Sequence, residues 1–217
     1  MDIVKLFNEN QPKYETTLPF SKEKVLFNAF KVKDAKKITM VIQEQNKKLS
    51  LIALYECLSS NSNANVLNMT LADAEYLFLQ MRTKSMDEYI NVNVADKKVK
   101  IKIDDLKIFN KLQDHHVNVG NNIILNLKTP RLKQLLALDQ FSEETYAKAC
   151  IESLSIHGQL YYVEKFVPKE FEQIIDNLPL SVSKEINEFV KNEPSLKFEI
   201  KTEESESEVT GFLSFFI

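Results

Sequence analysis

The sequence has few of the residues on which small-molecule chemistry usually depends. Its 217 residues include three glycines, three histidines, two cysteines and no tryptophan. Loops that cradle phosphates need clustered glycines, because backbone N–H groups must approach the ligand closely. Gly120, Gly158 and Gly211 lie far apart. We therefore expect neither a Walker-type nor a Rossmann-type nucleotide site.

Charge and hydropathy remove two further classes of partner. The formal net charge is -3, whereas nucleic-acid binders usually carry a surplus of basic residues against phosphate. A membrane-spanning helix needs about 18 consecutive apolar residues, and no apolar run approaches that length. We expect no nucleic-acid partner and no membrane partner.

The cysteines and histidines do not form a recognisable catalytic or metal-binding pattern. Cys57 and Cys150 are too few for a disulfide framework, and without a signal peptide we expect a reducing cytoplasm. Each lies among apolar residues of a predicted helix, which favours a buried and inert thiol. His115 and His116 are neighbours on a predicted strand and so point to opposite faces. We expect no metal, no cofactor and no small-molecule substrate.

Three charged groups have both a structural and a functional interpretation. Asp104 and Asp105 are typical of a strand end or turn, and nothing in the sequence separates their pKa values as acid–base catalysis requires. The acidic residues 203–208 predict a flexible loop or a contact with a basic partner. A third group lines one face of a predicted strand and either protects a sheet edge or meets an acidic partner or phosphates: Lys98, Lys100 and Lys102.

Apolar periodicity predicts runs of strands and runs of helices that are segregated along the chain. Predicted strands cover two segments within residues 14–32, then residues 90–94 and 99–103, a pair within residues 117–127 split at Gly120-Asn121, and residues 160–166, 198–202 and 209–215. Predicted helices begin near Asp34, Lys48, Thr70, Pro130, Ser142, Pro168 and Ile186, and the one from Ser142 extends through Leu154. Segregation favours an α+β fold, with mixed antiparallel strands, packed helices and a C-terminal β-hairpin.

The same pattern predicts the domain organisation. Residues 1–13 end in a polar break and are expected to form an N-terminal arm. Residues 14–217 are expected to form a single compact α+β unit. Its weakest seam falls near residues 128–130, between a mixed first part and a helical part that ends in a hairpin.

Two apolar segments are candidates for partner contacts. In the predicted helix 71–85, an apolar stripe formed by Leu77, Phe78 and Met81 is expected to face the core. The residues off this stripe are candidate contacts: Tyr76, Leu79 and Gln80. The end of the chain is apolar on both faces and needs cover from its own domain or from a partner. Its candidate contact residues are Phe212, Phe215, Phe216 and Ile217.

Residues 73–85, with the sequence DAEYLFLQMRTKS, resemble the signature helix of T-even-type phage baseplate hub proteins. Further similar segments follow the family's order: Leu18-Pro19, the lysine-rich residues 30–37, residues 189–194 and the terminal residues 210–216. The resemblance thus extends over residues 18–216. The sequence departs from the family pattern at residues 86–88, where a small residue or glycine is expected.

This resemblance implies a role in building the baseplate hub or the tail that grows from it. Members of the family have no known enzymatic activity and act through contacts with other tail and baseplate hub proteins. The expected function is that of an assembly factor or chaperone in the host cytoplasm. The alternative is a permanent hub subunit in the virion baseplate.

A remote alternative from another class is a small enzyme that depends on cysteine and histidine. It would need His157 or His116 to come within hydrogen-bond reach of Cys150, Cys57 or an aspartate.

Overall fold

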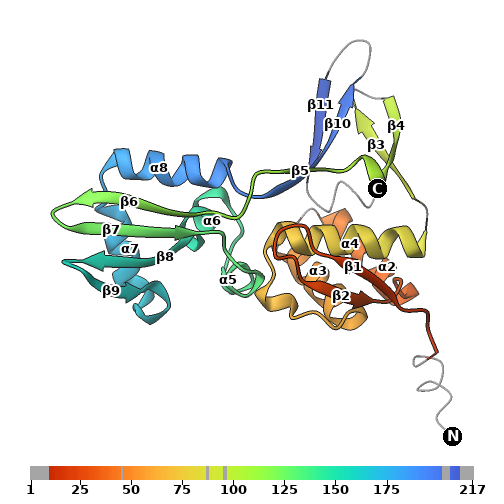
Figure 1. Cartoon of the computed structure of the whole chain (residues 1–217), viewed down its shortest axis with the longest axis horizontal. Coiled ribbons are helices and arrows are strands. Elements are labelled where there is room, and N and C mark those ends of the chain that lie inside the picture. The colour runs from red at the N-terminus through yellow and green to blue at the C-terminus, as the bar shows by residue number, and fades with distance from the viewer. Residues whose placement is uncertain (1–9, 45, 87, 95–96, 202–205, 211–217) are drawn as a thin grey trace, which may run out of the picture. The chain divides into compact units, whose positions relative to one another are not determined.

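The computed structural model describes residues 10–210, apart from residues 45, 87, 95–96 and 202–205 (Figure 1). The chain folds into two compact units. Unit 1 comprises residues 1–109 and 195–217, and unit 2 comprises residues 110–194. The seam predicted within one compact unit, near residues 128–130, instead lies inside unit 2. Residues 1–9 of the predicted arm lie outside the described residues.

Unit 1 begins with a hairpin and three helices, and it is completed by strands that precede and follow unit 2 in the sequence. Its elements are β1 (Tyr14–Thr17), β2 (Lys24–Phe27), α2 (Val32–Glu44), α3 (Lys47–Asn61), η1 (Val66–Asn68), α4 (Leu71–Ser85), β3 (Tyr89–Val94), β4 (Lys97–Lys102), η2 (Ile103–Asp105), β5 (Lys107–Phe109), β10 (Ser195–Lys201) and β11 (Glu206–Thr210). β1 pairs with β2, β3 pairs with β4, and a third sheet has the order β11-β10-β5, all antiparallel.

The core of unit 1 is organised around α4. Leu77, Phe78 and Met81 of this helix are fully buried, as the predicted core stripe requires. α4 contacts α3 and β10, and β10 contributes the buried Leu196 and Phe198. The core of unit 1 therefore depends on a strand that lies far along the chain from α4.

Unit 2 is a four-stranded antiparallel meander with helices. Its elements are β6 (Asp114–Gly120), β7 (Ile123–Lys128), α5 (Leu132–Ala137), α6 (Glu143–Ala149), β8 (Ile151–Ile156), β9 (Gln159–Tyr162), η3 (Val163–Lys165), α7 (Pro168–Asp176) and α8 (Leu180–Lys191). The strand order is β6-β7-β8-β9 (Figure 1). Buried side chains of β6, β7 and β8 pack with Val182, Ile186 and Phe189 of α8, and α7 adds partly buried residues. Unit 2 thus has a core of its own.

Unit 2 is inserted between two neighbouring strands of unit 1. Phe109 at the end of β5 and Ser195 at the start of β10 are register partners in the antiparallel ladder. At the ends of unit 2, the Asn110 side chain donates to the Glu193 backbone oxygen at 3.2 Å. The chain therefore leaves and re-enters unit 1 at adjacent positions.

The α+β prediction is confirmed, including the antiparallel strands and the hairpin formed by β10 and β11. The predicted helix from Ser142 through Leu154 is wrong in its second half. That helix, α6, ends at Ala149, and residues 151–156 form strand β8. Register shifts between Asn126 and Leu127 where β7 meets β8.

Candidate interaction surfaces

The helix that carries the family resemblance, α4, uses its first polar side chains inside the fold. Thr70 accepts a hydrogen bond from the Asp73 backbone N–H at 3.2 Å and so caps the helix. The two carboxylate oxygens of Asp73 accept from the backbone N–H groups of Phe20 and Ser21, each at 3.0 Å. Asp73 is fully buried. It therefore fixes the turn between β1 and β2 on the start of α4.

The last turns of α4 hold two further segments. Arg82 donates to the Tyr89 backbone oxygen at 2.9 Å, at the start of β3. The Ser85 hydroxyl accepts from the Phe30 N–H at 2.6 Å and donates to the Met81 backbone oxygen at 2.6 Å. Through these hydrogen bonds, the last turns of α4 hold both the segment before α2 and strand β3.

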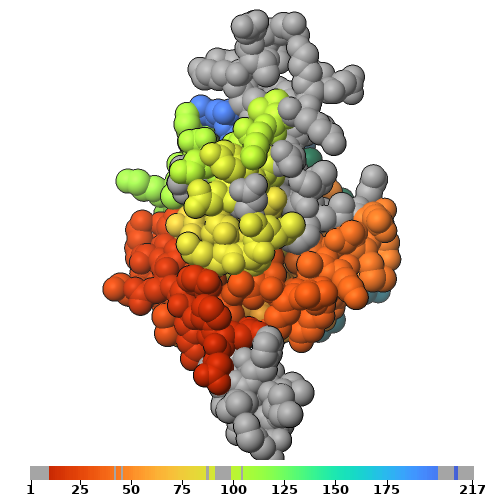
Figure 2. All heavy atoms as spheres, turned by 90° about the vertical axis from the view of Figure 1, so that its right-hand side faces the viewer, coloured from red at the N-terminus to blue at the C-terminus, as the bar shows by residue number. Residues whose placement is uncertain are grey.

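The outward side of α2 combines lysines with exposed apolar side chains. We define the α2 stripe as five exposed residues that share one side of this helix: Val32, Lys33, Lys36, Lys37 and Met40. Val32 is 74% exposed and Met40 is 63% exposed. The opposite side of the helix contributes the buried Ile38 and Val41 to the core. Orange atoms of the α2 region form part of the surface in Figure 2.

Cys150 lies in a buried polar cluster of unit 2. Its thiol donates to the Tyr146 backbone oxygen at 3.4 Å and lies 3.6 Å from Glu193 Oε1. The Tyr146 hydroxyl donates to the other carboxylate oxygen of Glu193. Burial raises the pKa of Cys150, and the negative charge of Glu193 raises it further. The thiol is therefore protonated at neutral pH.

Cys57 has a similar environment in unit 1. Its neighbour Asn61 donates to Asp34 Oδ2 at 2.9 Å and to the Cys57 backbone oxygen at 2.8 Å. Burial, followed by the charge of Asp34, raises the pKa of Cys57 to about 12. Both cysteines are buried, as predicted. A protonated, buried thiol is a poor nucleophile.

A model of the family described as T4 bacteriophage base plate protein matches residues 11–217. The chain belongs to this family. No curated protein and no solved structure matches it. Membership establishes a role in the phage baseplate and indicates interactions with other baseplate proteins.

The candidate contact residues of this baseplate protein on α4 are more buried than the sequence predicted. Leu79 is fully buried, so its assignment to an exposed contact surface is wrong. Tyr76 and Gln80 are half-buried. The buried positions of α4 occupy more than one side of the helix, because α3 and β10 both contact it. The predicted apolar stripe lies on one face of α4, whereas in the structure neighbouring elements cover more than one side of the helix.

The C-terminal candidates Phe212, Phe215, Phe216 and Ile217 lie outside the described residues. The side chains of Lys98 and Asp104 are likewise not described. Lys100 is exposed, with Nζ 4.3 Å from the centroid of the Tyr89 ring. Asp105 is exposed in η2. Of the predicted acidic loop, residues 206–208 belong to β11, where Glu208 pairs with Lys197 at 2.8 Å.

The three histidines of the baseplate protein occupy separate places in unit 2. His115 stacks on Phe189 of α8 with ring centroids 6.2 Å apart. His116 points to the other face of the sheet, where Nδ1 lies 2.7 Å from Asn126 Oδ1. His157 is an exposed turn residue between β8 and β9, at a φ of 50°. Within the described part of the chain, no histidine hydrogen-bonds to either cysteine, and no three metal-ligating side chains gather.

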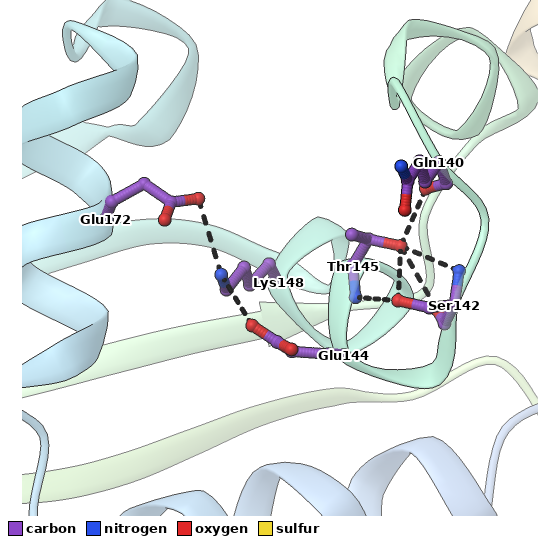
Figure 3. Close-up of polar contacts among 6 residues, drawn as sticks. All are labelled: Gln140, Ser142, Glu144, Thr145, Lys148 and Glu172. Atoms are coloured by element: carbon purple, nitrogen blue, oxygen red, sulfur yellow. Dashed lines mark hydrogen bonds and ion pairs between the residues drawn. The ribbon is translucent and has the colours of Figure 1, made fainter.

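Polar contacts fix α6 (Figure 3). This helix carries Tyr146, and Cys150 follows directly after its end. Ser142 accepts from the Thr145 N–H at 3.2 Å, and Thr145 Oγ1 accepts from the Ser142 N–H at 2.9 Å. Lys148 Nζ lies 2.9 Å from Glu144 and 3.3 Å from Glu172 of α7 (Figure 3). The capping box begins the helix, and Lys148 joins it to α7. No described helix is long and apolar enough to cross a membrane.

Proposed function

We propose that this protein is a baseplate hub assembly factor that binds other tail and baseplate hub proteins and catalyses no reaction. Family membership is the observation that carries the proposal, because a baseplate protein works inside a multi-protein assembly. The proposal includes no cofactor, no metal and no small-molecule substrate. Its place of action is the host cytoplasm during phage assembly.

The chemistry of the buried side chains supports binding rather than catalysis. In α4, Asp73, Arg82 and Ser85 bond to backbone groups of the same chain. A nucleophilic cysteine needs a lowered pKa or an adjacent base, whereas burial raises the pKa of both thiols. These groups stabilise the fold instead of presenting reactive atoms to a substrate.

The distribution of apolar surface supports an assembly factor over a permanent subunit. Permanent interfaces are large and more apolar than transient ones. The exposed large apolar side chains of the described residues are instead spread over both units, from Leu26 and Val32 to Leu160 and Leu180. Each unit also buries an apolar core of its own.

Quantitative mass spectrometry of purified virions beside infected-cell lysate tests this role. An assembly factor is expected to be plentiful in the lysate and absent from the particles. A fixed copy number per particle would overturn the assembly-factor role and establish the alternative, a permanent subunit of the hub. Failure of the purified protein to bind any baseplate protein would overturn the binding function itself.

A further inference from the structure

We propose that the α2 stripe is a docking surface for an acidic segment of a partner protein that also presents an apolar side chain. This inference rests on the proposed function, since it names the surface and the chemistry by which a baseplate partner would be bound. The charge of the surface, its apolar members and the direction of the helix all favour such a partner.

The segment of unit 1 that contains α2 is predominantly positive. Residues 31–48 contain six lysines and two acidic residues in a chain whose net charge is -3. One of the two acids, Asp34, is buried and accepts from the Lys31 N–H at 2.9 Å and from Asn61 at 2.9 Å. The first two turns of α2 therefore present lysines outward with no exposed carboxylate of their own.

Of the three lysines of the α2 stripe, only Lys37 forms an ion pair with a residue that the structure describes. Lys37 pairs with Glu56 of α3. Lys33 and Lys36 form no ion pair with any residue that the structure describes. Their ammonium groups are available to carboxylates of another protein.

The position of these lysines is unfavourable for the helix itself. The N-terminal end of a helix carries partial positive charge, so cations there oppose the helix dipole. Lys33 and Lys36 lie in the first turns of α2, while the exposed acid, Glu44, lies at its end. Helix stability therefore does not explain the arrangement, whereas attraction of an acidic partner does.

Two apolar side chains distinguish a protein segment from other anionic partners. Met40 lies between Lys33, Lys36 and Lys37 on the helix surface, and Val32 lies four residues before Lys36. Exposed methionine adapts to apolar partner side chains. Phosphate groups need only the cations. An acidic peptide with an apolar anchor thus satisfies both kinds of residue, whereas the phosphates of RNA satisfy only the lysines.

Binding of defined probes to the full-length protein tests the proposal. The first probe is a fluorescein-labelled helical peptide with glutamates flanking a leucine stripe, and its control has glutamine at every glutamate. The second and third probes are a single-stranded RNA of mixed sequence and phosphatidylglycerol vesicles. Fluorescence anisotropy measures peptide and RNA binding, and co-sedimentation measures vesicle binding. Only the acidic peptide is expected to bind well, and added salt is expected to weaken it.

Charge reversal locates the surface. The variant K33E/K36E/K37E is expected to weaken peptide binding about tenfold or more, because three attractive contacts become repulsive. Met40→Ser is expected to weaken it severalfold. The matched control K133E/K169E/K184E changes the net charge equally at three exposed lysines of unit 2 and is expected to leave affinity within about twofold. Circular dichroism checks that each variant folds.

Three results would overturn the inference: no binding of the acidic peptide, equal weakening by the control variant, or tighter binding of RNA or vesicles. These results leave the proposed function standing if the wild-type protein still binds purified baseplate proteins. If it binds none of them, the proposed function fails, whatever the peptide shows.

Discussion

Asp73 shows how one buried side chain holds two distant parts of the chain. Its carboxylate accepts from the backbone N–H groups of Phe20 and Ser21, more than fifty positions earlier. Asp73→Asn replaces one accepting oxygen with an amide that cannot accept. We expect a loss of about 2–3 kcal/mol in the free energy of unfolding, since hydrogen bonds to charged groups are the stronger ones. Urea denaturation measures it, with the exposed Asp139→Asn as the matched control.

Glu193 is a residue whose charge opposes folding. Burial raises its pKa above the ordinary value of 4.5, although hydrogen bonds from Tyr146 and Cys150 act in the opposite direction. Between pH 4.5 and the folded-state pKa of Glu193, the folded protein therefore keeps a proton that the unfolded chain has released. The stabilising contribution of Glu193 to the free energy of unfolding is fully present below pH 4.5. It is lost as the pH rises through the folded-state pKa.

Glu193→Gln removes this pH dependence, because an amide releases no proton. We expect the stability of the variant relative to the wild type to increase as the pH rises from 4.5 through the folded-state pKa of Glu193. Urea denaturation at several pH values measures the difference. A difference that is constant with pH, or that moves toward the wild type, contradicts this account of Glu193.

The two thiols give a chemical test at the same scale. Because burial raises the pKa of Cys57 to about 12 and raises that of Cys150 as well, neither thiolate is populated at neutral pH. The native protein is expected to react slowly with a thiol-specific disulfide reagent, and both cysteines are expected to react once it is unfolded in urea. The double variant C57S/C150S is expected to support phage assembly. Loss of assembly by a folded double variant would argue against a non-catalytic role.

At the scale of elements, the misassigned strand β8 has a specific physical origin. The bulge between β7 and β8 pairs Ser153 with Asn126 and Ile151 with Leu127, so Glu152 is skipped. Ile151 and Leu154, three residues apart, therefore both join the core cluster of unit 2. Three-residue spacing is the mark of a helix. A bulge that depends on a partner strand cannot be read from the local sequence.

Other elements were predictable where a local signal defined them. Thr70 and Ser142 cap α4 and α6, and Pro168 begins α7, as their residue types predict. β5 was not predicted, because its three residues form a strand only through pairing with β10. The fold class was thus accessible from the sequence. The burial of Leu79 was not, since it depends on which elements surround α4.

The turn between β8 and β9 offers a test of a single element. His157 and Gly158 have φ values of 50° and 82°, which suits a two-residue hairpin turn and favours Asn-Gly. His157→Asn is expected to retain stability or raise it by up to about 1 kcal/mol, and assembly is expected to continue. Gly158→Ala is expected to lose about 1 kcal/mol or more, although no atom crowds the added Cβ. Thermal denaturation of both variants checks the pair.

At the scale of the whole molecule, the insertion of unit 2 leads us to expect that each unit folds without the other. Phe109 and Ser195 are register partners, so a two-residue Asn-Gly turn in place of residues 110–194 would close β5 and β10 into a hairpin. We expect this shortened chain to fold, and residues 110–194 alone to unfold cooperatively, because each unit has its own core. Amide NMR spectra of the two proteins check this. A collapsed, poorly dispersed spectrum of the shortened chain would contradict it.

The insertion also sets the order in which the protein can be completed on the ribosome. All of unit 2 is synthesised before β10, so unit 2 can fold while β5 still waits for its partner strand. Unit 1 then receives Leu196 and Phe198, which its core requires, only after all of unit 2 has been made. A nascent chain that stops before β10 would therefore carry a finished later unit and an unfinished earlier one.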